Sequence, residues 1–395
     1  MLSRFNTILH THLLTAKPRS YLYPQARQKA SRPAVGRALG CIALAGIILA
    51  SAACQSVQPS PPSPAAAKPD TSQPTASQAI ASQPTKPAQQ PATSTQLTKV
   101  SVALDWYPWS NHTGLYMANE QGYYKEEGLD VNIYVPSNPE DVLKLVGSEK
   151  DSFGISYQSD VLLAAAEGIP VKSIAALVQH PLNSVMTLKS AGITRPKQLE
   201  GKKVGYPGIP GHEALLATMM EKDGSSISKV ELVNVGFDLV PPLLAKKVDA
   251  SLGAYWVHES ILAELEGYPV DIMRVEQWGV PDFYELLLVT NEKMAKGQPD
   301  VLKRFLRATT KGYADVQKDP AKAIDLLMKV NPETNRQMEE KGIKLLMPLW
   351  TDGVSTFGMQ TRERWQSYAN WMRERKQLTK DVNIDSVFTT EFLPR

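Results

Sequence analysis

The stretch KVSVALDWYPWSNHTGLYMANEQGYYKEEGLDVNIYVP, residues 99–136, decides the fold of this chain. Its first part, KVSVALDW (99–106), alternates β-branched and polar residues and predicts a strand, whereas residues 112–128 predict a helix that ends at Gly128. The run VNIYVP that follows predicts a second strand. A strand, a helix and another strand in this order indicate a parallel βαβ unit with a right-handed crossover.

The same alternation of strands and helices continues along the chain. Further strands are predicted at 152–157 and 171–178, and three or so long helices close the sequence. We expect the chain to leave one lobe near 183–190, to build a second lobe and to return near 283–291. The fold class predicted is therefore α/β, with mostly parallel sheets in two lobes joined by two hinge strands, and with a ligand bound between the lobes.

The first part of the chain predicts an exported protein. Seven basic and no acidic residues precede Cys54, and residues 38–53 are small and apolar but too short to span a bilayer, which is typical of a signal peptide. Cys54 follows small residues as in a bacterial lipobox, so we predict a lipid anchor that holds the protein at the extracytoplasmic face of the cell membrane. Ordinary secretory cleavage beside an incidental cysteine is the alternative.

A tract rich in Pro, Ser and Ala follows Cys54 and predicts an extended tether that cannot bury a core. The predicted division of the chain is a signal peptide, a lipidated tether, a first lobe, a second lobe and a return to the first lobe, at 1–53, 54–98, 99–186, 187–286 and 287–395.

Composition excludes several classes of function. Without the leader the chain has 36 basic and 40 acidic residues, which argues against nucleic acid as a partner. Cys41 and Cys54 are the two cysteines, so the folded part has no thiol nucleophile and no thiolate metal site. No common catalytic or nucleotide-binding motif is present. We therefore predict a protein that is not an enzyme and that uses no cofactor and no metal, although a site built from distant histidines stays an alternative.

The loop at 104–118 predicts a site for a flat heterocycle. Trp106 and Trp109 offer ring faces for stacking, and Asp105 and Asn111 offer polar groups that can read the edge of a ring. A strand end that opens into a helix is also where open α/β folds bind ligands. The alternative is that a polar residue caps the helix and the tryptophans fill the core.

Two more segments supply candidate ligand residues. The loop at 205–211 precedes a helix whose first N–H groups can bind polar or anionic groups, and a plain turn is its alternative. In the segment at 253–260, Glu259 can accept hydrogen bonds from an amine, or it lies on a helix surface. The candidates from these segments are Pro207, Gly208, Gly211, Trp256 and Glu259. Two tyrosines complete the set: Tyr157, at the end of the predicted strand 152–157, and Tyr284, at the start of the strand-like segment 284–294.

Residues 104–131, with 201–216 and 253–260, resemble substrate-binding proteins of the thiamine-pyrimidine-precursor type. The resemblance implies a type II periplasmic-binding-protein fold and an ABC permease and ATPase as partners. Such proteins bind formylaminopyrimidine, related ones bind riboflavin, and sulfonate and nitrate binders are more distant. The residues that match the ligand-binding motifs are Asp105, Trp106, Asn111 and Tyr116 in the first loop, Pro207, Gly208 and Gly211 in the second, and Trp256 and Glu259 in the third.

The pair Trp109–Ser110 departs from this resemblance, because pyrimidine binders usually carry a small polar pair there. An extra indole favours a wider ring system, so we predict riboflavin ahead of formylaminopyrimidine, with a filled cavity as the alternative reading. The fungal pyrimidine synthase of thiamine biosynthesis resembles the same first loop. The resemblance gives that enzyme a cysteine-rich iron-binding segment, which has no counterpart after Cys54.

Overall fold

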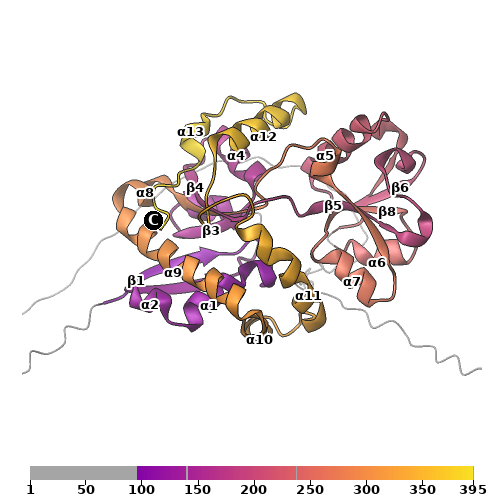
Figure 1. Ribbon diagram of the computed structural model, residues 1–395. Coiled ribbons are helices and arrows are strands. Elements are labelled where there is room, and N and C mark those ends of the chain that lie inside the picture. The colour runs from indigo at the N-terminus through magenta and orange to yellow at the C-terminus, as the bar shows by residue number, and fades with distance from the viewer. Residues whose placement is uncertain (1–95, 139–140, 237, 395) are drawn as a thin grey trace, which may run out of the picture. The chain divides into compact units, whose positions relative to one another are not determined.

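The computed structural model describes residues 96–138, 141–236 and 238–394 (Figure 1). Residues 94–395 form one compact unit. The predicted signal peptide, Cys54 and nearly all of the tether lie outside the described residues. Within the described part, no helix combines the length and the apolar character that a membrane span requires.

The described residues form two five-stranded sheets. The chain builds four strands of the first sheet, then all five strands of the second, and returns to add the fifth strand of the first. The first sheet has the order β2-β1-β3-β10-β4. Its strands are Thr98–Ala103 (β1), Leu129–Tyr134 (β2), Phe153–Ser156 (β3), Val171–Val178 (β4) and Leu286–Asn291 (β10). The second sheet has the order β7-β6-β8-β5-β9. Its strands are Asn183–Leu188 (β5), Lys203–Tyr206 (β6), Glu231–Asn234 (β7), Ala250–Tyr255 (β8) and Val270–Arg274 (β9).

Helices cover both sheets. In Figure 1, α1, α2 and α9 lie on one side of the first sheet and α4, α12 and α13 on the other, whereas α5, α6 and α7 lie with the second sheet. The helices of the first lobe are Thr113–Glu120 (α1), Tyr123–Glu126 (α2), Val142–Gly147 (α3), Gln158–Ala166 (α4), Glu292–Gly297 (α8), Pro299–Lys318 (α9), Pro320–Val330 (α10), Arg336–Leu346 (α11), Arg362–Glu374 (α12) and Ile384–Val387 (α13). Those of the second lobe are Pro210–Lys222 (α5), Val240–Leu244 (α6) and Glu259–Leu265 (α7).

The sheets are mixed, which corrects the expectation of mostly parallel sheets. β10 is antiparallel to both β3 and β4, and β5 is antiparallel to both β8 and β9. Each of these two strands enters its sheet from the other lobe, so it runs opposite to the strands that the βαβ units lay down. The prediction of a two-lobed type II periplasmic-binding-protein fold is confirmed.

The chain passes between the sheets at 179–182 and again at 275–285. These passages precede the segments 183–190 and 283–291 where we expected them. The reason is that β5 and β10 pair along their length with two neighbours each, which makes them central strands of the sheets that they enter. The connections themselves have no strand structure.

The predicted helix at 112–128 is two helices, α1 and α2, with a break at Gly122, whose φ is +78°. The missing side chain at Gly312 lets α1 pack closely against α9, where a Cβ added at Gly312 would come 2.1 Å from the carbonyl oxygen of Gly114. On the same helix, Phe305 stacks on Phe153 of β3 with ring centroids 4.0 Å apart. These contacts fix the loop between β1 and α1 over the first sheet.

Candidate functional site

A buried hydrogen-bonded group joins the carboxyl ends of β1 and β3. Asp105 follows β1 and is 6% exposed. One of its carboxylate oxygens lies 2.9 Å from Nε2 of His112, and the other accepts a 2.6 Å hydrogen bond from the hydroxyl of Tyr157, which follows β3. Because Nδ1 of His112 accepts the backbone N–H of Trp109, Nε2 carries the proton and donates to Asp105. The adjacent parallel strands β1 and β3 therefore bring two predicted site residues together.

A second buried group comes from β8 and from both connections between the sheets. Glu285 is 2% exposed and accepts hydrogen bonds from the backbone N–H of Leu182 (2.6 Å), the amide of Asn183 (3.0 Å) and the hydroxyl of Tyr255 (2.7 Å). Burial raises the pKa of Glu285 to about 7, because these donors compensate only part of the lost hydration. No basic residue is among these three partners.

The two groups lie close together. Burial raises the pKa of Tyr157 well above its usual value. The charge of Asp105 is the second cause, and the charge of Glu285 adds to the effect. Burial also raises the pKa of Tyr255 well above its usual value. The charge of Glu285 is the second cause, and Asp105 contributes further. Two carboxyl groups and two phenols from both sheets are thus near enough to influence one another's charge. We call Asp105, Tyr157, Tyr255 and Glu285 the acid–tyrosine cluster.

Trp109 lies beside this cluster and bridges the sheets. Its indole, 8% exposed, has its centroid 5.9 Å from the ring of Tyr255 and 5.0 Å from the ring of His258. Trp109 lies in the β1–α1 loop, whereas Tyr255 ends β8 and His258 follows it. Protein side chains therefore cover the side of the Trp109 ring that faces the second lobe.

Asn111 is a buried polar residue whose side chain makes no hydrogen bond. It is fully buried in the turn before α1, and neither its side-chain oxygen nor its side-chain nitrogen has a hydrogen-bond partner. Leaving a buried amide without partners costs about 1–3 kcal/mol. The backbone carbonyl oxygen of Asn111 accepts a hydrogen bond from the hydroxyl of Tyr313 on α9, which fixes the backbone. Among the predicted site residues, Asn111 thus has both a donor and an acceptor available for a ligand.

The Pro207–Gly211 loop packs against β8. Gly208 has a φ of +82°, and a Cβ there would lie 2.5 Å from the side chain of Asn234. Gly253 of β8 has a φ of +90°, and a Cβ there would lie 2.6 Å from the ring of His212. Burial lowers the pKa of His212 to about 4, so its ring is neutral at pH 7. The loop reaches the strand that carries Tyr255, two residues before that tyrosine.

Two predicted site residues are already covered by protein. The guanidinium of Arg274 lies 3.6 Å from the centroid of the Trp256 ring, and the indole N–H donates to the carbonyl of Pro181. The hydroxyl of Tyr284 accepts the backbone N–H of Thr361 at 2.8 Å, and the side chain is 1% exposed. Trp256 and Tyr284 adjoin the cluster members Tyr255 and Glu285 in the chain, but their rings are covered by Arg274 and Arg364.

The remaining predicted residues lie around the cluster. Trp106 is half-buried and meets Tyr107 edge-on at 6.0 Å, and Tyr116 is half-buried in α1, where burial raises its pKa to about 12. Glu259 accepts the backbone N–H of Tyr255 at 2.8 Å and pairs with His258. Gly211, in the first turn of α5, has nothing nearer to an added Cβ than Gln377 at 3.7 Å.

Sequence reasoning missed Glu285 as a site residue. Its only signal is an acidic residue placed directly before the apolar run LLLVT, a position where a charge is buried once the strand enters the sheet. Glu339 was also missed. It lies in α11, is 1% exposed, and accepts the backbone N–H of Ser110 at 3.0 Å across 229 residues of sequence.

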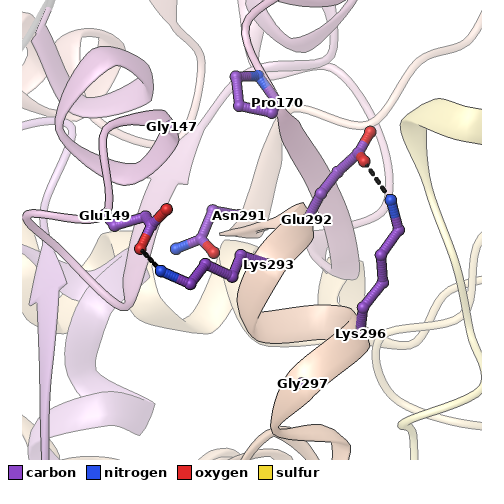
Figure 2. Close-up of a pocket in the computed structure, with 8 residues that line it drawn as sticks. All are labelled: Gly147, Glu149, Pro170, Asn291, Glu292, Lys293, Lys296 and Gly297. Atoms are coloured by element: carbon purple, nitrogen blue, oxygen red, sulfur yellow. Dashed lines mark hydrogen bonds and ion pairs between the residues drawn. The ribbon is translucent and has the colours of Figure 1, made fainter.

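A depression of about 530 Å³ lies elsewhere, at the edge of the first sheet where β10 ends (Figure 2). Two exposed ion pairs border it, Glu149–Lys293 at 2.6 Å and Glu292–Lys296 at 2.7 Å. Because β10 runs antiparallel to β3 and β4, this edge is opposite to the one that carries the acid–tyrosine cluster. It contains none of the predicted site residues. Within the described ranges, no group of three or more metal-ligating side chains is present.

Comparison with known proteins shows the family of this chain. A profile described as NMT1/THI5-like matches residues 109–323. The chain belongs to the NMT1/THI5-like family. A formylaminopyrimidine-binding protein of Halalkalibacterium halodurans is 37% identical over 298 residues, which cover 74% of this chain and 90% of the relative. A 4-amino-5-hydroxymethyl-2-methylpyrimidine phosphate synthase of Saccharomyces cerevisiae is 31% identical over 62% of this chain and 74% of that enzyme.

Solved structures agree on the fold. The periplasmic aliphatic sulphonate binding protein SsuA of Escherichia coli superposes with a TM-score of 0.59 at 14% identity, covering 75% of this chain and 94% of that protein. The alkanesulfonate-binding protein SsuA of Xanthomonas axonopodis gives 0.58 at 13% identity, covering 74% and 98%. At such low identity the likeness establishes the two-lobed fold alone.

Proposed function

We propose that the protein is the extracytoplasmic substrate-binding component of an ABC importer and captures formylaminopyrimidine or a closely similar aminopyrimidine. The observation that carries this proposal is the acid–tyrosine cluster, in which Asp105 and Glu285 each accept a hydrogen bond from a tyrosine and Glu285 has no basic partner among its hydrogen bonds. An aminopyrimidine presents an exocyclic amine as donor and ring nitrogens as acceptors. A carboxyl group with a pKa near 7, such as Glu285, can meet either need.

The name of the Halalkalibacterium relative supports the same ligand class. The sequence-based preference for riboflavin has no such support, and we replace it. Trp109, on which that preference rested, packs against Tyr255 and His258 and is only 8% exposed, so its indole does not widen the site. Of the alternatives considered from sequence, the pyrimidine is therefore the one that we retain.

We propose binding rather than synthesis, although several relatives are named as synthases. The cysteine-rich iron-binding segment that the resemblance implies for the fungal enzyme has no counterpart after Cys54. Export and a lipid anchor at Cys54 would also separate the protein from cytosolic substrates. The partners that this role implies are a permease and an ATPase.

A ligand panel tests the proposal. The purified chain is heated with formylaminopyrimidine, riboflavin or an aliphatic sulfonate, and the unfolding temperature is followed at increasing ligand concentration. A ligand that binds only the folded state stabilises it in proportion to the logarithm of its concentration. We expect the unfolding temperature to rise with the logarithm of ligand concentration for the pyrimidine alone. A shift with riboflavin or the sulfonate alone would reject the proposed ligand, and a new pyrimidine product would reassign the protein as an enzyme.

Trp106→Ala should weaken pyrimidine binding at least tenfold and leave the fold intact, because a ring stacked on a half-buried indole contributes about 0.5–1.5 kcal/mol beyond its buried area. Isothermal titration of the variant measures the loss. Tyr268→Ala is the matched control, since Tyr268 is an aromatic residue of the second lobe with 43% exposure. Equal affinity in both variants would remove Trp106 from the site.

Cys54→Ser should release the protein from membranes, because a thioether-linked lipid cannot form on serine. Fractionation of cells that express the variant measures the effect. Cys41→Ser, which changes the other cysteine of the leader, is the control and should stay with the membrane. Continued membrane association of Cys54→Ser would mean that the leader itself is the anchor.

A further inference from the structure

The second lobe touches the first at a place that the proposed binding chemistry does not use. Gly342 of α11 lies against the segment after β8, where an added Cβ would be 2.7 Å from the carbonyl oxygen of Val257. Both residues are buried. The absence of a side chain at Gly342 is therefore what lets α11 of the first lobe approach the backbone of the second.

His258, the next residue, extends this contact. Its Nδ1 lies 3.0 Å from a carboxylate oxygen of Glu259, and its Nε2 lies 4.0 Å from Glu339 of α11. Its ring also meets the indole of Trp109 edge-on, at 5.0 Å between centroids. The imidazole is thus enclosed by two carboxylates and an aromatic ring, and one of the carboxylates and the ring belong to the other lobe.

Glu339 is held in place for this contact by the first lobe alone. One of its oxygens accepts the backbone N–H and the hydroxyl of Ser110, and the other accepts the hydroxyl of Thr334 at 2.9 Å. Ser110 follows Trp109 directly, so α11 and the β1–α1 loop are locked to each other before the second lobe is considered. The pair Trp109–Ser110, which departs from the expected motif, serves as one half of an interlobe contact.

We propose that Trp109, Glu339 and Gly342 of the first lobe and His258 of the second form a latch that holds the two lobes together without ligand. The proposal rests on the proposed function in one respect: a latched apo protein has a larger binding-competent fraction, which raises its apparent affinity for whatever ligand the cleft takes. Trp109 and His258 act as positioning residues for closure.

The latch depends on pH. The charged groups that face His258 are Glu259 of α7 and Glu339 of α11, whereas β8 contributes Tyr255 and the β1–α1 loop contributes Trp109. Burial alone would lower the pKa of His258, but Glu259 and Glu339 outweigh it and raise the pKa. A raised pKa means that the protonated ring is the form that the latch stabilises. The latch is therefore at full strength below the ordinary histidine pKa and weakens as pH rises through the raised value.

Hydrogen exchange of the ligand-free, full-length chain tests the latch. We expect Gly342→Ala to increase exchange about tenfold in peptides covering 253–262 and 336–346, because the added methyl group forces α11 away from Val257. Gly297→Ala is the matched control, a glycine at the end of α8 with no atom within 4 Å of an added Cβ, and it should exchange like the wild type. Unchanged exchange in Gly342→Ala would overturn the latch.

His258→Gln provides a second test that does not add volume to the contact. At pH 6 the variant should exchange about threefold to tenfold faster than the wild type in the same two peptides, and at pH 9 the two proteins should agree. A difference that is absent at pH 6, or equal at both pH values, would reject the protonated ring as part of the latch. No ligand is present in either experiment, so a failure of the pyrimidine assignment leaves these results unaffected.

Discussion

Asp105→Ala should lower the free energy of unfolding by about 3 kcal/mol, the largest loss that we expect from any single change in the site. The substitution leaves the buried Nε2–H of His112 and the half-buried hydroxyl of Tyr157 without an acceptor. Each unpaired buried donor costs about 1–3 kcal/mol. Urea denaturation followed by circular dichroism measures the change, with an unaltered slope as evidence that both proteins unfold in the same way.

Asp130→Ala is the control for this prediction, because Asp130 lies on β2 of the same sheet but is exposed. It should change the free energy of unfolding by no more than about 0.5 kcal/mol. If Asp105→Ala were as stable as this control, Asp105 would not organise the loop, and the acid–tyrosine cluster would lose one of its two centres.

Glu285→Gln should change how stability depends on pH. Below pH 4.5 the carboxyl group is protonated in both the folded and the unfolded chain. Because burial raises the pKa in the folded state from 4.5 to about 7, the unfolded chain loses the proton first as pH rises, and the folded state loses stability between these values. At about 1.4 kcal/mol per pH unit, the loss is about 3 kcal/mol and is complete above pH 7.

The glutamine variant cannot ionise, so its stability relative to the wild type should rise by about 3 kcal/mol between pH 4 and pH 8. Any hydrogen bond that glutamine makes less well than glutamate adds a constant offset and leaves this slope unchanged. Glu231→Gln, at an exposed position on β7, is the control and should show no such slope. Parallel curves for Glu285→Gln and the wild type would mean that Glu285 titrates as an ordinary surface carboxylate.

For the first half of the proposed site, the pattern of the sequence was sufficient to predict that Asp105 and Tyr157 lie at strand ends. Asp105 and Tyr157 each follow an apolar strand, and two parallel neighbouring strands bring such positions to one edge of a sheet. The position of β4, at 171–178, follows equally from an apolar run of the right length. In both cases the information lies within a few residues of the feature that it predicts.

The second half of the site depends on contacts between distant parts of the chain. Glu339 reaches Ser110 from 229 residues away, and nothing near either residue indicates the other. Trp256 and Tyr284 illustrate the converse. The local sequence around an aromatic residue beside a strand is the same whether a ligand or a neighbouring side chain covers its ring. Arg274 covers the first and Thr361 engages the second, and both partners come from other elements.

Crystals grown with formylaminopyrimidine give the most direct test of where this protein binds its ligand. We expect difference density for one pyrimidine ring within hydrogen-bonding distance of at least one member of the acid–tyrosine cluster, with the amide of Asn111 or the indole of Trp106 completing the contacts. Density confined to the depression between Glu149 and Lys296, at the opposite edge of the first sheet, would show that the cluster is not the binding site.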